Sequence, residues 1–145
     1  MVMEQLDELY REVILDHFKN SRHSGELADA KIKAHGANPL CGDELVFFIA
    51  LDDHRIRQVR FTGKGCAISQ AAASMLAGQL EGKTVAEARH MIEAMKRLMQ
   101  GELPNPSTDL GDLEALAGVR KFPVRIKCAA LSWNIVERGL SEQHV

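Results

Sequence analysis

Three cysteines and one neighbouring aspartate are the residues of this chain best suited to chemistry. Cys41, Gly42 and Asp43 are consecutive, so in extended backbone the thiol and the carboxylate project to the same side. Cys66 and Cys128 each lie beside cationic residues, which favour the thiolate, the form that binds metal and attacks sulfur. The four side chains therefore offer three soft ligands and one hard ligand for a single metal site.

A single free cysteine is most often a small core residue, and the local contexts of these three argue against that reading. Cys41 lies in the turn 38–42, ahead of a strand, where the chain is generally exposed. Cys66 and Cys128 are placed where a strand or loop leads into a helix, whose positive end favours a thiolate. The spacing of the three matches no compact zinc motif, so the fold must bring them together.

The ligand types leave the metal open. Three cysteines and an aspartate complete a tetrahedral zinc site, and the thiolates equally suit iron in a sulfide cluster. Arg125 and Lys127 either stabilise a thiolate and orient Asp43 or are ordinary surface charges. The six histidines show no ligand spacing, and none is assigned as a ligand.

The first half of the chain predicts a helix followed by a sheet. Apolar residues at helical spacing predict a helix from about Met3 to Lys19, with an apolar stripe formed by Leu6, Leu9, Tyr10, Val13, Ile14 and Phe18. Three further segments predict an antiparallel meander: Lys31–Ala34, Leu45–Leu51 and Val59–Thr62. The middle segment is apolar on both faces, so we expect it at the centre of the sheet, with helices covering both sides.

The second half predicts four helices, placed from Cys66 to Gly82, from Thr84 to Gly101, from 109 to 118 and from about Cys128 onward. Thr84 and Glu87 have the spacing of a capping box, which marks a helix start. The loop 102–107 looks like an insertion. On the second of these helices, Met91, Met95 and Met99 recur at helical spacing and are expected in the core.

Length and composition predict a single cytoplasmic domain, 1–145, with a sizeable core. An odd number of cysteines without an N-terminal apolar signal stretch favours a reducing compartment. The net charge is −2 and only five Phe, one Tyr and one Trp are present, so no nucleic-acid partner is expected. The apolar runs are too short for a bilayer, so we expect a soluble chain without a membrane partner.

Four motifs carry a resemblance to a known family: Leu9–Phe18, Asn38–Asp43, Gly63–Ser69 and Lys127–Cys128. In this order they resemble the U-type iron–sulfur cluster assembly scaffold family, IscU and SufU, over nearly the whole chain. The resemblance implies an α+β fold, a small three-stranded antiparallel sheet packed with about five helices, as in IscU and the N-terminal domain of NifU.

The resemblance also implies a function. The protein would accept persulfide sulfur from a cysteine desulfurase, then assemble a transient 2Fe–2S cluster or pass the sulfur to downstream acceptor proteins. It would act as a zinc-dependent sulfurtransferase partner of the desulfurase rather than as a conventional enzyme. Lys127 stands where the IscU branch has histidine, and the stretch 97–120 is similar to the SufU insertion. In the SufU branch zinc is bound by three cysteines and the aspartate, which are here Cys41, Asp43, Cys66 and Cys128.

Within that resemblance Cys41 is expected to be the sulfur acceptor, because flexible neighbours let it leave the metal and attack a persulfide. Cys66 and Cys128 are expected to remain as anchors. Two alternatives stay open. The same thiolates could hold a 2Fe–2S cluster with zinc only as a substitute, or the chain could be a structural zinc-binding interaction domain without sulfur transfer.

Overall fold

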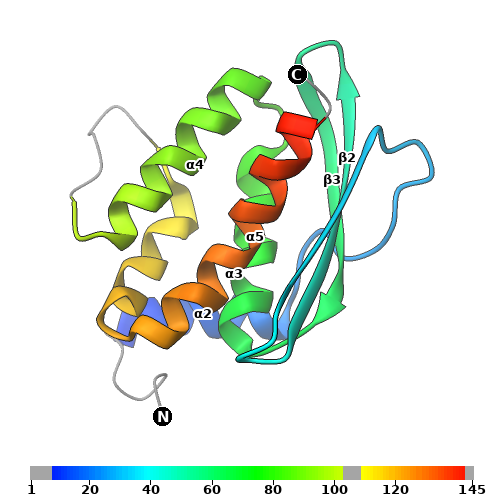
Figure 1. Cartoon of the computed structure of the whole chain (residues 1–145). Coiled ribbons are helices and arrows are strands. Elements are labelled where there is room, and N and C mark those ends of the chain that lie inside the picture. Colours follow the sequence, from blue (N-terminus) through cyan, green and yellow to red (C-terminus); the bar gives the residue numbers. More distant parts are fainter. Residues whose placement is uncertain (1–7, 103–108, 143–145) are drawn as a thin grey trace.

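The computed structural model describes residues 8–102 and 109–142. Its elements in chain order are α2 (Glu8–Lys19), β1 (Ile32–Asn38), β2 (Asp43–Asp52), β3 (Arg55–Lys64), α3 (Ala67–Leu80), α4 (Val85–Met99), the 3-10 helix η1 (Gly111–Lys121) and α5 (Pro123–Glu142). The strands form one antiparallel sheet in the order β1-β2-β3 (Figure 1). The predicted α+β class, the meander and the central place of the second strand are confirmed.

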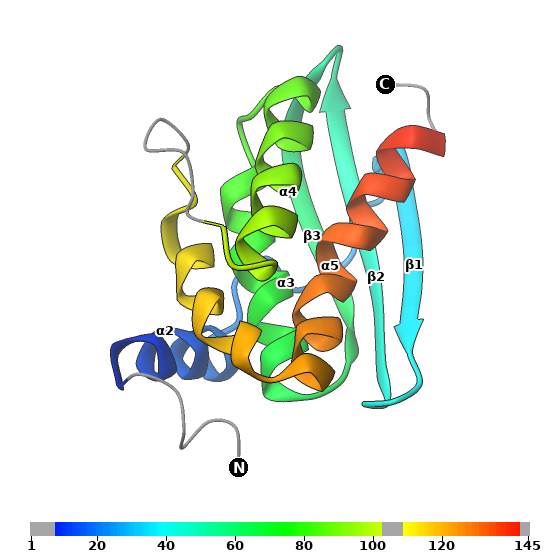
Figure 2. The same cartoon turned by 60° about the vertical axis from the view of Figure 1, so that its left-hand side comes forward.

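The helices lie on one side of the sheet, where β2 and β3 bury their inward side chains (Figures 1 and 2). Phe47 faces Phe61 across the strands, with ring centroids 5.8 Å apart. The prediction that helices cover both faces is wrong, because the connection 20–31 passes over the other face. On that face Phe48 is buried, and the Lys33 ammonium lies 5.6 Å from its ring centroid. A long side chain and a loop thus replace a helical layer.

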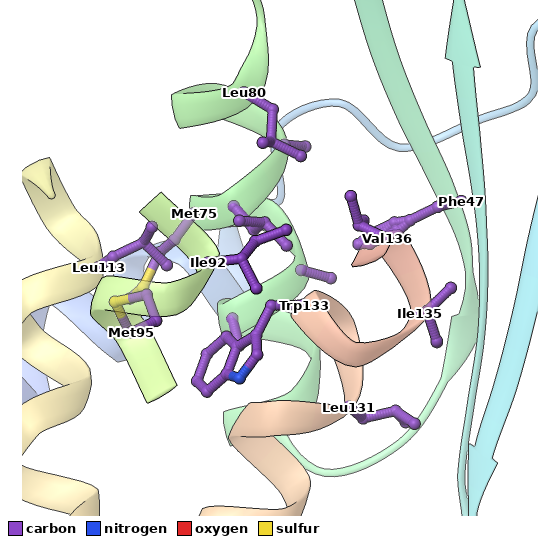
Figure 3. Packing of buried hydrophobic residues seen from close by; sticks show 14 of the residues in the cluster. Phe47, Met75, Leu80, Ile92, Met95, Leu113, Leu131, Trp133, Ile135 and Val136 are labelled. Atoms are coloured by element: carbon purple, nitrogen blue, oxygen red, sulfur yellow. The ribbon is translucent and has the colours of Figure 1, made fainter. Parts of the chain in front are cut away.

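Helix α3 runs through the middle of the helical layer and contacts α2, α5, η1 and β3. Its small residues Ala71, Ala72, Ala73 and Ala77 are fully buried, which lets neighbouring elements approach closely. Around it the core joins several elements, and Figure 3 shows Met75, Ile92, Leu113 and Trp133 in this cluster. The three methionines predicted in the core, Met91, Met95 and Met99, are buried.

Helix α2 shows a narrower buried face than its sequence predicts. Ile14 and His17 are buried, whereas Leu9 and Phe18 of the predicted stripe are exposed. The helix packs mainly on α3 and η1, so only one edge of the stripe meets the core. Residues Met3–Asp7 of the predicted helix lie outside the described part of the chain.

The local signals for helix ends are confirmed. Thr84 and Glu87 form the predicted capping box, with both of its hydrogen bonds present. Gly82 and Gly101 follow α3 and α4 with φ of 87° and 92°, a conformation that glycine adopts without steric cost. No helix among the described residues is long and apolar enough to cross a membrane.

The segment predicted as a short helix over 109–118 is instead a 3-10 helix over Gly111–Lys121. A 3-10 helix has three residues per turn. The buried apolar residues recur at that interval, at Leu110, Leu113, Leu116 and Val119. The sequence thus holds a period of three that favours this helix type. Residues 103–108 of the preceding loop lie outside the described residues.

Candidate metal and sulfur site

Cys41 is held in the tight turn that joins β1 to β2. Its backbone N–H donates to the carbonyl of Asn38 at 3.2 Å, and the N–H of Leu40 donates to Asn38 Oδ1 at 3.3 Å. Gly42 closes the turn with φ of 68°. The side chain of Cys41 is half-buried, so this thiol is partly accessible at the end of the sheet.

Cys128 reaches the same point from α5. Its Sγ lies 2.6 Å from the Sγ of Cys41 and 3.8 Å from the side-chain nitrogen of Asn38. The prediction that α5 begins near Cys128 is wrong, because the helix already begins at Pro123. Proline suits the first position of a helix, where its missing N–H would be unbonded anyway. Cys128 therefore lies in the second turn and is fully buried.

Asp43, the first residue of β2, is 1 % exposed and has one free oxygen. Its Oδ1 accepts hydrogen bonds from the backbone N–H of Cys66 at 2.9 Å and from the hydroxyl of Ser69 at 3.1 Å. Its Oδ2 is buried and has no partner among the described residues. A buried carboxylate oxygen without a partner is costly, and a cation would satisfy it.

Cys66 is the N-cap residue of α3, as its sequence context predicts. Its Sγ accepts from the backbone N–H of Ser69 at 3.5 Å. Possible ligand atoms of Cys41, Asp43 and Cys128 lie within 4.8 Å of one another. Cys66 is not part of this group but adjoins it through its backbone bond to Asp43. Of the four residues predicted as ligands, the fold thus brings three together directly.

Burial raises the pKa of the Cys128 thiol above its ordinary value, and the nearby thiols of Cys41 and Cys66 raise it further. The expected effect of a neighbouring cation is present, but burial outweighs it. Arg125 opposes the upward shift in pKa, since its Nη1 lies 3.9 Å from the sulfurs of both Cys41 and Cys128. Lys127 is exposed. Arg125 is thus the cation that acts on the sulfurs.

The residues present fit a soft metal ion. Two thiols converge beside a buried carboxylate oxygen that lacks a partner, and a third thiol adjoins them. This donor set is typical of zinc and of iron in sulfide clusters. Asn38 and Ser69 support the site although the sequence analysis assigned them no role. The available sequence signals were that Asn38 precedes Cys41 by three residues and that Ser69 lies in the first turn of α3.

Fold and site together define a small α+β domain in which thiols suited to binding a metal lie together at one end of the sheet. The chain belongs to the family described as NifU-like N-terminal domain, whose sequence model matches residues 9–129. The resemblance drawn from the four sequence motifs is thereby confirmed.

Among the similar proteins, one is named a sulfurtransferase and others are named iron–sulfur cluster assembly scaffolds. The chain is 46% identical to the zinc-dependent sulfurtransferase SufU of Bacillus subtilis, over 95% of this chain and 93% of that protein. It is 36% identical to the iron–sulfur cluster assembly scaffold protein IscU of Streptococcus pyogenes, over 100% and 93%. The crystal structure of FiSufU from Fervidobacterium islandicum is 34% identical with a TM-score of 0.85, covering 89% and 94%.

Proposed function

We propose that this protein is a single cytoplasmic domain that accepts persulfide sulfur from a cysteine desulfurase at Cys41. Its zinc ligands are Cys41, Asp43, Cys66 and Cys128. The observation that carries the proposal is the convergence of two sulfurs beside the free oxygen of Asp43. The zinc-dependent sulfurtransferase name of the Bacillus subtilis relative supports it.

The three thiols have different roles because the elements that hold them differ. Zinc held by these residues would keep their thiolates deprotonated and, being redox-inert, would leave the sulfur chemistry to the cysteines. Cys128 is buried in α5 and Cys66 caps α3, so both are fixed by their helices. Cys41 and Cys66 are both half-buried, and of the two it is Cys41 that lies in a turn, free to move toward a partner.

The transfer step needs no oxidant or reductant. The Cys41 thiolate attacks the outer sulfur of the donor persulfide and forms a new sulfur–sulfur bond. The donor's own sulfur–sulfur bond breaks, its cysteine leaves as a thiolate, and the proton stays on the transferred sulfur. The guanidinium of Arg125, 3.9 Å from Cys41 Sγ, stabilises the anionic sulfur.

The rim of the site suits a protein as the sulfur donor. Leu40, next to Cys41, is 69% exposed, and Val124, in the first turn of α5, is 57% exposed. Exposed large apolar side chains beside a reactive group favour contact with a protein surface. We therefore expect a cysteine desulfurase, and then downstream acceptor proteins, to contact this rim.

The test is mass spectrometry of the full-length protein after incubation with a cysteine desulfurase and cysteine. We expect a persulfide on Cys41 in the parent protein and none on the Cys41→Ala variant. The free energy of unfolding of both proteins is measured alongside. A persulfide that persists undiminished in Cys41→Ala would exclude Cys41 as the acceptor. A stability loss with unchanged sulfur transfer would favour the structural zinc-domain alternative.

A second candidate function is assembly of a 2Fe–2S cluster on the same thiols. Three neighbouring cysteines suit iron, and the scaffold name of the Streptococcus pyogenes relative favours it. Anaerobic addition of iron and sulfide separates the two functions. A stable chromophore that moves to an apo acceptor favours the scaffold, and its absence favours sulfur transfer.

A further inference from the structure

His17 of α2 is buried within a polar network that joins three helices. Its Nδ1 lies 2.9 Å from the hydroxyl of Ser74 in α3, and its Nε2 lies 2.8 Å from Oδ2 of Asp112 in η1. The Ser74 hydroxyl also accepts from the backbone N–H of Arg22 at 3.0 Å. These contacts link positions that are far apart in sequence, and the function proposed above does not use them.

The arrangement of serine, histidine and aspartate does not form a nucleophilic site. Ser74 is fully buried between the helices, so no substrate can reach its hydroxyl. The network therefore acts by holding elements in place. A buried polar network in which every member has a partner rigidifies its surroundings.

The contact between His17 and Asp112 lies in the first turn of η1. Hydrogen bonds of 3-10 helices have poorer geometry than those of α-helices, and runs of this length are uncommon. Side-chain contacts must therefore hold η1 in place. They are the packing of its buried apolar residues and the hydrogen bond between His17 and Asp112 in its first turn. Gly111 packs against the side chain of Gln79, which anchors the same end.

The far end of η1 leads directly into the candidate site. Phe122 follows η1, and its backbone N–H donates to the carbonyl of Val119 at 2.9 Å. The Phe122 carbonyl in turn accepts from the N–H of Arg125 at 2.8 Å, in the first turn of α5. A shift of η1 along its axis would therefore move Arg125 relative to the two sulfurs.

We propose that His17 is a positioning residue that, through Asp112, fixes η1 and thereby the start of α5 over the sulfurs of Cys41 and Cys128. The inference rests on the proposed function only in taking these sulfurs as the reactive site.

The test replaces the exposed partner, because a change at Asp112 leaves the core intact. Asp112→Ala removes the acceptor for His17, and Asp112→Asn keeps an oxygen there. Glu114→Ala is the matched control, since it deletes an exposed carboxylate from the same first turn. Zinc release from the full-length protein to a chromogenic chelator is measured with the free energy of unfolding.

We expect Asp112→Ala to release zinc about tenfold faster, in the range found when residues that orient metal ligands are removed. Asp112→Asn should restore most of the parent rate, and Glu114→Ala should match the parent. Equal rates for Asp112→Ala and Glu114→Ala would overturn the proposal. The proposal would also be overturned if the rate of zinc release rose only in proportion to the loss of unfolding free energy across the variants.

A second readout uses metal-free protein and separates this inference from the zinc site. Iodoacetamide labelling of Cys128 should become about tenfold faster in Asp112→Ala, because local opening of α5 exposes a buried thiol. If the parent protein binds no zinc, the proposed zinc site fails and labelling alone decides the inference. Unchanged labelling of Cys128 in Asp112→Ala would then refute it.

Discussion

The turn that carries Cys41 and the junction that carries Cys66 lie at the same end of the sheet and are built in opposite ways. At Gly42, in the turn, an added Cβ would meet nothing within 4 Å. At Gly65, in the junction, it would collide with the carboxylate of Asp43 and the hydroxyl of Ser69. The turn with Cys41 is the open half of the site, where the backbone has room to move. The junction with Cys66 is the fixed half, where Asp43 and Ser69 fill the space.

Asp43 belongs to the fixed half although it is two residues from Cys41 in sequence. Its carboxylate is bonded to the backbone of Cys66 and to Ser69. Glycine at position 65 makes this close approach feasible, because a Cβ there would collide with Oδ1 of Asp43 and Oγ of Ser69. The comparison shows that a reactive cysteine can keep its freedom while its neighbouring ligand stays anchored.

The largest effect is expected from Gly65→Ala, which adds a methyl group to the fixed half of the site. The new methyl group must displace Asp43 and Ser69, and overpacking of this kind costs about 1–3 kcal/mol. Because the carboxylate itself moves, zinc affinity should fall by about tenfold or more. Urea unfolding and chelator competition measure both effects. Unchanged zinc affinity would show that Asp43 is not held in place by this junction.

Gly42→Ala is the matched change in the open half. The new methyl group meets no atom, but φ of 68° is unfavourable for alanine by about 1–2 kcal/mol. We therefore expect a loss of stability of that size with zinc affinity within about threefold of the parent, well below the tenfold scale of a disturbed site. The same two measurements apply. A larger loss of zinc affinity than in Gly65→Ala would reverse the comparison.

Thr84→Ala tests a region outside both halves, at the start of α4. Loss of the cap should cost about 1 kcal/mol without changing zinc affinity. The backbone hydrogen bond from Thr84 holds the pKa of Glu87 below its ordinary value of 4.5. The ionised form thus stabilises the fold above that value, and the contribution is lost as the pH falls through the lowered folded pKa.

The pH dependence offers its own check on the cap. Between neutral pH and the lowered folded pKa of Glu87, the stability difference between Glu87→Gln and the parent should shrink, because protonation removes from the parent the charge that the variant lacks. Urea unfolding at several pH values measures it. A difference that grows as the pH falls would contradict the assigned hydrogen bond.

The smallest effect is expected from Arg125→Ala, which acts on both halves through charge. Arg125 lowers the pKa of Cys128 against the raising effect of burial, so its removal should raise that pKa further. We expect an effect of about 1 kcal/mol or less, because the guanidinium is partly solvated. Arg125 Nη1 also lies 3.9 Å from the sulfur of the partly accessible Cys41, so the rate of Cys41 alkylation at a fixed pH in metal-free protein measures the loss of this charge. Lys127→Ala is the control, and an equal change in rate there would assign the effect to general charge.

The sequence by itself determined the elements and the residues able to do chemistry. Capping residues, glycines after helices and alternating apolar segments act within a few positions, so they can be recognised without knowledge of the fold. The capping box at Thr84, the central strand β2 and the helix start at Cys66 follow from such signals. The period of three in η1 was equally visible, although the sequence analysis did not use it.

Only the tertiary structure decided which of these residues meet and what their environment does to them. Burial of Cys128 outweighs the effect expected from its charged neighbours, because the pKa responds to desolvation by packing from distant segments. The bonds of His17 to Ser74 and Asp112 depend on contacts between three helices, which local spacing does not encode. The convergence of Cys41, Asp43 and Cys128 likewise required the turn, the sheet and α5 to come together.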